Sequence, residues 1–366
     1  MARGDGDPAL WEKLLPGVAV LRSYDRSWLR GDLLAGATVT AYLIPQVMAY
    51  AVIAGLPSVV GLWAILPAMA VYVILGASRQ LSVGPESTTA LMTAAGVGAL
   101  VATAGDDRYA EVAALLAIAV GLVCIVGWVA RLGFLASLLS KPVLIGYLVG
   151  VAVLMITSQF GKVTGLEIDG NVPVDETLSL LRQLGSIHWP TFILAAVVFT
   201  LLLVANRLWP RLPGPLIILL VAAWAVALFG LDRFGIDTIG EVPDGLPSFR
   251  VPELGDLSVW ALLPYAVGIA VVGYSDNVLT GRAFAAKRRE PVDAGQELLA
   301  LGTANVAAGL FQGFPVSSSG SRTVIGDAMG SRTQLHSVVV IVLTVMTLLF
   351  AGPVLSTFPD AALGAL

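Results

Sequence analysis

The chain has 366 residues, of which 57% are hydrophobic and 13% are charged, and its formal net charge is −4. Because soluble domains carry roughly a quarter charged residues, this composition excludes a soluble protein and predicts an all-α polytopic membrane protein without a nucleic-acid partner. The single cysteine, Cys124, excludes a disulfide framework, and His188 and His336 stand far apart in the sequence, so neither a metal site nor a cofactor is expected.

Apolar segments that could span a bilayer follow a polar arm, residues 1–30, which lacks the apolar core of a signal peptide. A spanning helix needs about 20 apolar residues. The candidate spans are 31–55, 59–76, 111–131, 141–160, 190–206, 214–230, 258–284, 296–312 and 335–352. Two shorter segments, 86–104 and 318–329, each follow a break rich in glycine and proline, and we expect both to be half-helices whose N-termini approach each other near mid-membrane. A further segment begins at Pro359.

Charges between the segments indicate their orientation, because lysine and arginine favour the cytoplasmic side of short loops. Alternate loops are basic, with Arg131 and Lys141, then Arg207 and Arg211, then Lys287, Arg288 and Arg289. The other loops are acidic on balance and contain Asp106, Asp107, Glu167, Asp169, Asp175, Glu176, Asp237, Glu241, Asp244, Glu253 and Asp256. We expect a multi-pass protein of the inner or plasma membrane with a cytoplasmic N-terminus. The run 287–289 is interpreted as a topology anchor, or alternatively as a contact for lipid headgroups.

The order of the segments repeats along the chain. In residues 31–230, a segment with Pro45 near its centre precedes the first short segment. In residues 258–366, a segment with Asp276 near its centre precedes the second short segment. An odd number of spans per copy inverts the second copy relative to the first and places binding sites at broken helices between them. The first copy would hold segments 1–7, the second segments 8–11 and the start of segment 12, so we expect the chain to lack about three helices of a complete transporter.

The stretch 311–330, F-Q-G-F-P-V-S-S-S-G-S-R-T-V-I-G-D-A-M-G, is too short and polar to span a bilayer but lies between apolar segments. Non-helical backbone at membrane depth requires burial in protein or a polar cavity. Pro315 can end one element, and the small residues from Ser317 to Ser321, including Ser319 and Gly320, leave backbone N–H groups accessible. A half-helix beginning here would direct its positive end inward, with Arg322 about one turn along. We interpret the stretch as an anion site near the bilayer midplane; the alternative is a polar loop that returns to the surface.

Several motifs resemble those of the SulP family of sulfate permeases and related anion transporters. They are R-G-D-L-L-A-G (30–36), I-P-Q-V-M-A-Y-A (44–51), G-L-P (55–57), G-L-W (61–63), S-R-Q-L-S-V-G-P (78–85), Q-E-L-L-A-L-G-T-A-N (296–305) and F-P-V-S-S-S-G-S-R-T (314–323). The resemblance covers residues 30–366. It implies fourteen segments in two inverted seven-segment repeats, a core domain, a scaffold domain and a C-terminal STAS domain, and this sequence has neither the last three segments nor the STAS domain.

The resemblance also implies that the anion lies between the N-termini of segments 3 and 10. Carried over by position, segment 10 offers Ser319, Ser321 and Arg322, segment 1 offers Gln46 and Tyr50, and segment 3 begins at Gly84 and Pro85. Asp276 and Thr280 match a position that holds sodium or a carboxylate in cation-coupled members.

Each polar residue also has an ordinary structural interpretation. Arg322 could snorkel or form a structural pair, although its planar fork suits an oxyanion. Asp276, costly inside an apolar segment, is expected to pair with Arg322, a cation or a proton. Glu86 is interpreted as a proton site, or alternatively as a favourable helix-start carboxylate. Gln46 and Tyr50, one turn apart, either line the pocket or form a packing turn beside a proline.

The sequence therefore predicts a secondary active transporter for a small inorganic oxyanion, with sulfate first, coupled to protons and working by alternating access. The alternatives are a sodium-coupled bicarbonate or dicarboxylate transporter, an anion exchanger, or a membrane sensor that binds an anion without moving it. An enzyme is not expected, because the serines at 317–321 have no histidine base in local reach. In its full-length form we expect a homodimer.

Overall fold

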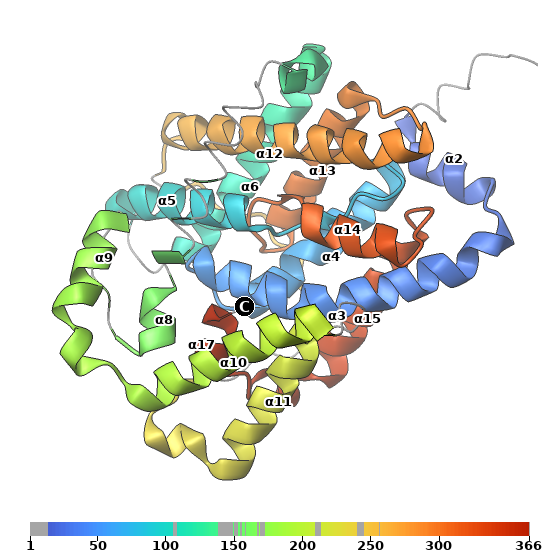
Figure 1. Cartoon of the computed structure of the whole chain (residues 1–366). Helices are drawn as coiled ribbons and strands as arrows, with labels where there is room; N and C mark the ends of the chain where they lie inside the picture. Colours follow the sequence, from blue (N-terminus) through green and yellow to red (C-terminus); the bar gives the residue numbers. More distant parts are fainter. Residues whose placement is uncertain are drawn as a thin grey trace, which may run out of the picture.

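The computed structural model describes residues 14–104, 108–137, 173–208, 214–239, 245–255 and 257–365, together with short pieces between residues 149 and 168. Its regular structure is almost entirely helical, which confirms the predicted all-α class (Figure 1). The helices at predicted spans are α3 (Leu29–Ile53), α4 (Val59–Leu75), α6 (Tyr109–Val129), α10 (Trp189–Leu208), α11 (Gly214–Phe229), α12 (Val259–Arg288), α13 (Ala294–Leu310) and α15 (Leu335–Phe350). The predicted span 141–160 lies mostly outside the described residues.

Length and apolar composition alone qualify three of the described helices as bilayer spans: Arg26–Ile53, Tyr109–Val129 and Val259–Arg288. The other apolar helices are shorter and complete the bundle by packing. Short elements connect them: α2 (Pro16–Arg22), η1 (Arg26–Trp28), η3 (Leu132–Ser137), α8 (Phe160–Thr164), α9 (Pro173–Arg182), η4 (Leu184–Ser186), η5 (Leu231–Phe234), α16 (Gly352–Leu355) and α17 (Asp360–Gly364). Helix α9 lies in a segment that was predicted to be a loop.

Helix α13 lies at the centre of the larger part of the bundle, against α6 on one side and α4 on another. Small residues make the α6 contact close. A Cβ added at Gly302 would lie 2.8 Å from the carbonyl oxygen of Gly121, and one added at Gly309 would lie 2.5 Å from that of Ala114. Such backbone-to-backbone packing is typical of membrane helices, where small residues allow close approach. Helix α13 is therefore held firmly against its neighbours.

A smaller group of helices lies along the other side of α3. Helices α10 and α11 pack on each other, α17 contacts α10 and α8, and both α11 and α17 contact α3 (Figure 1). The chain segment before α17 is tied to the segment after η5, because the amide of Ile239 donates to the carbonyl of Phe358 at 3.0 Å. This division is of the kind that the family resemblance implies, with a core domain and a scaffold domain.

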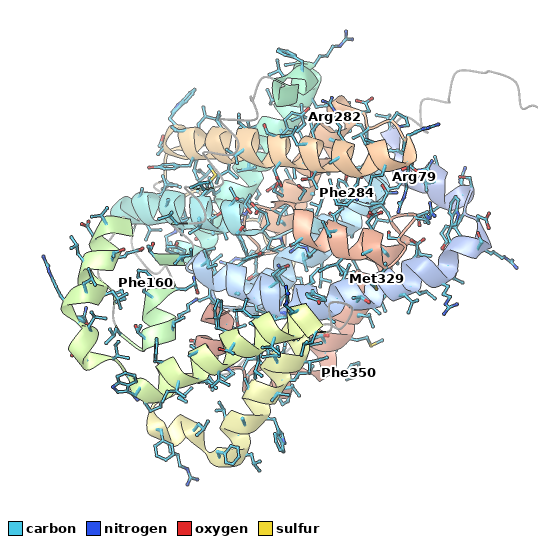
Figure 2. The ribbon with its side chains drawn as sticks, in the orientation of Figure 1. Arg79, Phe160, Arg282, Phe284, Met329 and Phe350 are labelled. Carbon is cyan, nitrogen blue, oxygen red and sulfur yellow. The ribbon has the colours of Figure 1, made fainter. Side chains whose placement is uncertain are left out.

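Large apolar side chains are exposed over much of the outer surface. Phe350 at the end of α15 is 75% exposed, and Trp260 in α12 is 80% exposed (Figure 2 shows Phe350). Soluble monomers rarely expose extensive apolar patches. The exposed residues therefore mark a surface that faces lipid or other protein segments.

Two interrupted helices meet inside the larger part. Strand β1 (Val83–Gly84) precedes α5 (Ser87–Ala104), and β2 (Ser317–Ser318) precedes α14 (Gly320–Ala328). The expected short segments thus begin where predicted, but only α14 is a half-helix. With 9 residues it rises about 13 Å, whereas the 18 residues of α5 rise about 27 Å. Helix α14 is short because Gly330, with a φ of +93°, leaves the helical region just after it.

Candidate functional site

The two strands bring the N-termini of α5 and α14 together. They pair antiparallel, with Val83 opposite Ser318 and Gly84 opposite Ser317. The amide of Ser319 extends the pairing by donating to the carbonyl of Ser82 at 2.8 Å. The first N–H groups of a helix have no partner within it and carry a partial positive charge. Two such ends therefore face one region, which we call the cradle.

The α14 side of the cradle is open. Ser319 caps α14, accepting from the amide of Arg322 at 3.4 Å, and is 5% exposed. Ser321 is exposed, and a Cβ added at Gly320 would have no neighbouring atom within 4 Å. The start of α14 therefore borders open space at Gly320. Helix N-termini of this kind are ready anion sites.

The α5 side is occupied by its own carboxylate. Glu86, which is half-buried, accepts from the amide of Thr89 at 2.8 Å and from the hydroxyl of Ser87 at 3.2 Å. The side chain therefore caps α5, as the structural interpretation of this residue predicted. While the Glu86 carboxylate is ionised, it also repels an incoming anion. The same side chain can therefore cap α5 and act as a proton site.

Arg322 lies behind the cradle and is 0% exposed, so it does not snorkel. Its Nη1 donates to the carbonyl of Pro85 at 2.9 Å and its Nε donates to the hydroxyl of Ser82 at 3.4 Å. Its Nη2 is buried without a hydrogen-bond partner, and Arg322 takes part in none of the ion pairs found among the described residues. The guanidinium therefore places a positive charge that has no direct ion-pair partner among the described residues next to the start of α5.

Helix α3 supplies the side chains that face the open end. Gln46 Nε2 lies 3.5 Å from the hydroxyl of Ser321, which in turn lies 3.2 Å from that of Ser319. The amide oxygen of Gln46 is buried without a partner. Tyr50, one turn further along α3, lies within electrostatic range of Arg322 and Glu86. The structure thus gathers the residues that the sequence assigned to segments 1, 3 and 10.

Asp276 of α12 joins this group through β2 rather than through arginine. Its carboxylate accepts from the hydroxyl of Ser318 at 2.7 Å. The expected pairing with Arg322 is wrong, because β1 and Pro85 direct the guanidinium toward α5. Thr280 follows one turn later on α12, and both residues are half-buried. Among the described residues, no group of three or more His, Cys, Asp or Glu side chains could hold a metal.

Polar side chains that the sequence analysis did not single out complete the hydrogen bonds of the two breaks. Gln334 Nε2 donates to the carbonyls of Ser78 and Leu81, both at 2.9 Å, and the amide of Ser82 donates to Thr323 Oγ1 at 3.1 Å. Glu297 and Asn305 of α13 act in the same way and are described below. Glutamate and asparagine inside a predicted span were the available signal, because such residues are costly in a membrane.

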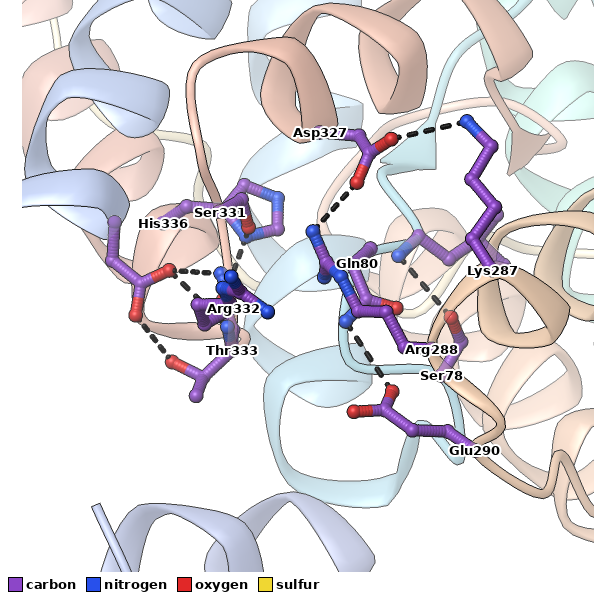
Figure 3. Close-up of polar contacts among 12 residues, drawn as sticks. Ser78, Gln80, Lys287, Arg288, Glu290, Asp327, Ser331, Arg332, Thr333 and His336 are labelled. Atoms are coloured by element: carbon purple, nitrogen blue, oxygen red, sulfur yellow. Dashed lines mark hydrogen bonds and ion pairs between the residues drawn. The ribbon is translucent and has the colours of Figure 1, made fainter. Parts of the chain in front are cut away.

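The far end of α14 is tied to the end of α12 (Figure 3). Asp327 accepts from Lys287 Nζ at 3.1 Å and from Arg288 Nη2 at 2.6 Å. Close by, Asp32 of α3 accepts from the amides of Arg332 and Thr333 at 2.7 and 3.1 Å. Both ends of α14 are therefore fixed, and two residues of the basic run make specific ion pairs.

Residues 29–366 match a sequence profile described as the sulfate permease family. A probable sulfate transporter of Mycobacterium tuberculosis is 53% identical over 96% of this chain and 62% of its own length. A chloroplastic sulfate transporter of Arabidopsis thaliana is 31% identical over 97% of this chain and 53% of its own. The chain thus spans less than two thirds of the length of these relatives.

Solved structures share the fold. The murine anion transporter Solute Carrier 26 family member A9, in an inward-facing state, matches with a TM-score of 0.91 at 24% identity, over 100% of this chain and 63% of that one. The transmembrane domain of a cyanobacterial bicarbonate transporter matches with a TM-score of 0.84 at 22% identity, over 93% and 88%. At this identity the likeness concerns the fold, an inverted-repeat transporter architecture.

Proposed function

Because the chain belongs to the sulfate permease family, we propose that it forms the anion-carrying membrane part of a secondary transporter, with sulfate as the first substrate. The observation that carries the proposal is the cradle itself. The open N-terminus of α14, the exposed Ser321 and the free space at Gly320 face Gln46, while the buried Arg322 adds positive charge from behind.

Charges around the cradle support coupling to protons. Each helix end contributes roughly half a positive charge, and Arg322 contributes one more. Glu86 and Asp276, which lie within electrostatic range of one another, subtract two when both are ionised. The region is then about neutral and holds a dianion weakly. Protonation of either carboxyl removes one opposing charge, so proton and anion favour each other's binding, and linkage makes the effect reciprocal.

The division of the fold supports alternating access. Helix α3 supplies Gln46 and Tyr50 to the cradle and also contacts α11 and α17 of the smaller group. Movement of the larger part along this contact would expose the cradle first to one side of the membrane and then to the other. The protein would lie in the cell membrane with residues 287–289 and the N-terminus at the cytoplasmic face, and would assemble as a homodimer at full length.

A sodium-coupled carrier of bicarbonate or a dicarboxylate is the second candidate. Asp276 and Thr280, one turn apart on α12, supply a carboxylate and a hydroxyl, which are oxygen ligands suited to a hard cation. In this case sodium would replace the proton as the partner of the Asp276 carboxylate. Anion uptake driven by an inward sodium gradient, with no response to a proton gradient, distinguishes this mechanism from the first.

The cradle can be tested by filling it. Gly320→Leu would add a side chain in front of α14 whose Cβ has no protein atom within 4 Å, so we expect sulfate binding to be lost while the protein folds. Gly98→Leu is the matched control, because a Cβ added at Gly98 in α5 also has no neighbour within 4 Å. Calorimetry with sulfate on the full-length protein is the measurement. Equal affinity in both variants would place the anion elsewhere.

A further inference from the structure

The backbone of the two breaks lies deep in the bundle and needs hydrogen-bond partners. Strands β1 and β2 have two residues each, too few to hold an isolated pair together. Val83, Ser317 and Ser318 are at most 1% exposed, so water cannot replace missing partners, and an unpaired buried backbone group is costly. The cradle therefore depends on whatever side chains supply the remaining hydrogen bonds.

Asn305 of α13 supplies the hydrogen bonds of Val316, the residue that leads into β2. Its Oδ1 accepts from the amide of Val316 at 2.9 Å, and its Nδ2 donates to the carbonyl of the same residue at 3.0 Å. The side-chain amide thus pairs with Val316 as a neighbouring strand would. Asn305 is 0% exposed. A second bond from Nδ2 to the carbonyl of Leu301 at 2.9 Å fixes its orientation.

Glu297, two turns earlier on α13, supplies hydrogen-bond acceptors to the segment that leads into β1. Its Oε1 accepts from the amides of Ala77 and Ser78 at 2.9 and 3.0 Å. Both carboxylate oxygens also accept from the hydroxyl of Tyr72 at the end of α4, at 2.9 and 3.0 Å. Oε2 accepts from the side-chain amide of Asn277, the residue after Asp276. Glu297 is 0% exposed.

One helix therefore holds both sides of the cradle. Glu297 fixes the approach to β1 and the rotation of α12, and Asn305 fixes the approach to β2. Helix α13 is itself locked against α6 by the close contacts of Gly302 and Gly309. Both side chains come from the motif at residues 296–305, which contributes no residue to the cradle itself.

We propose that Glu297 and Asn305 are positioning residues for the anion site: they set the distance between the N-termini of α5 and α14 without touching the anion. The inference rests on the proposed function, because it concerns the same site. If this inference is right, the negative charge of Glu297 is dispensable, because the backbone amides of Ala77 and Ser78 need only an acceptor oxygen. The donor–acceptor pair of Asn305 is then essential.

The two residues call for different substitutions. In Asn305→Asp the size is kept, but a carboxylate oxygen replaces the donor that faces the Val316 carbonyl. Both hydrogen bonds of that donor, to the carbonyls of Val316 and Leu301, are lost, so we expect sulfate affinity to fall at least about tenfold. In Glu297→Gln the amide oxygen can still accept from Ala77 and Ser78. Its NH2 group can donate to the Oδ1 of Asn277, which is buried without a partner, once that amide turns over. We expect affinity close to that of the wild type.

The experiment combines sulfate calorimetry with hydrogen–deuterium exchange on the full-length protein. Asn305→Asp should weaken binding and accelerate exchange in the peptide 311–322, with exchange in α6 unchanged. Thr303→Val is the matched control, because that hydroxyl only donates to Leu299 within α13 at 2.8 Å. Glu297→Ala should accelerate exchange around residues 77–84 and weaken binding, and Glu297→Gln should restore both.

The outcomes separate the two proposals. If the wild-type protein binds no anion, the proposed function fails, and the exchange data still report whether α13 holds the strands. If the wild type binds sulfate but Asn305→Asp leaves affinity and exchange unchanged, the positioning role is wrong. Loss of sulfate binding in Glu297→Gln with normal exchange around residues 77–84 would also overturn it, because the carboxylate charge would then be what matters.

Discussion

The guanidinium of Arg322 donates to the carbonyl oxygen of Pro85 across 2.9 Å, from the first turn of α14 to the residue before Glu86. One side chain thereby joins the two broken helices and brings a charge to their meeting point. Because Arg322 is completely buried, removing it must affect both the fold of the cradle and its electrostatics. A substitution of Arg322 should therefore change stability and anion binding together, whereas a substitution of Ser321 should change binding alone.

Arg322→Ala should lower both sulfate affinity and thermal stability. Loss of a charged partner weakens binding by about 1.5–3 kcal/mol, and the abandoned Pro85 carbonyl costs a further 1–3 kcal/mol or so of folding free energy. Arg322→Lys should keep part of the binding, since it keeps the charge but not the fork. Arg282→Ala is the control, because Arg282 is an exposed cation on α12. Unchanged sulfate affinity in Arg322→Ala would show that this charge does not serve the anion.

Ser321→Ala should weaken binding without affecting stability. The hydroxyl is exposed at the open side of the cradle and lies near Gln46 and Ser319. Removal of one neutral hydrogen-bonding group is expected to cost about 0.5–1.5 kcal/mol of binding free energy. Calorimetry and a melting curve on the same sample measure the two effects. A lowered melting temperature with normal affinity would make Ser321 a structural residue only.

Lower pH should tighten sulfate binding, since each proton taken up by Glu86 or Asp276 removes a negative charge that faces the anion. Glu86→Gln and Asp276→Asn imitate the protonated state, so both should reduce the pH dependence of sulfate uptake. The measurement is uptake into proteoliposomes, compared with and without an inward proton gradient. Glu111→Gln is the control, because its carboxylate pairs with Arg108 at 3.1 Å at the start of α6. If uptake does not depend on the proton gradient in the wild type or in either variant, proton coupling is wrong, and the mechanism is anion exchange or sodium coupling.

Much of this site could be predicted from residue types. What could not be predicted depends on contacts between residues that are far apart in the chain. Glycine and proline marked both breaks, and the spacing of Gln46 and Tyr50 gave one face of α3. The direction of Arg322 could not be read, because it depends on β1, a strand of two residues without a sequence signature. The partner of Asp276 and the roles of Glu297 and Asn305 depend on contacts between residues far apart in the chain.

The predicted orientation can be tested with cysteine labelling. The two ends of α12, a helix of 30 residues, lie about 45 Å apart, so Phe249 before it and Ala286 near its end belong to opposite faces. We expect Phe249→Cys to react with an impermeant thiol reagent from outside intact cells and Ala286→Cys only after permeabilisation. The native Cys124 is 2% exposed and should give little background. The opposite pattern would reverse the topology.

The position of the anion is the central claim, and selenate reports it directly because selenium scatters anomalously and selenate has the shape and charge of sulfate. Anomalous diffraction should be recorded from crystals of the full-length protein grown with selenate. We predict a selenium peak in the free space before Gly320 and Ser321, between the N-termini of α14 and α5. A selenium peak elsewhere in the membrane part, with none in the cradle, would contradict the account.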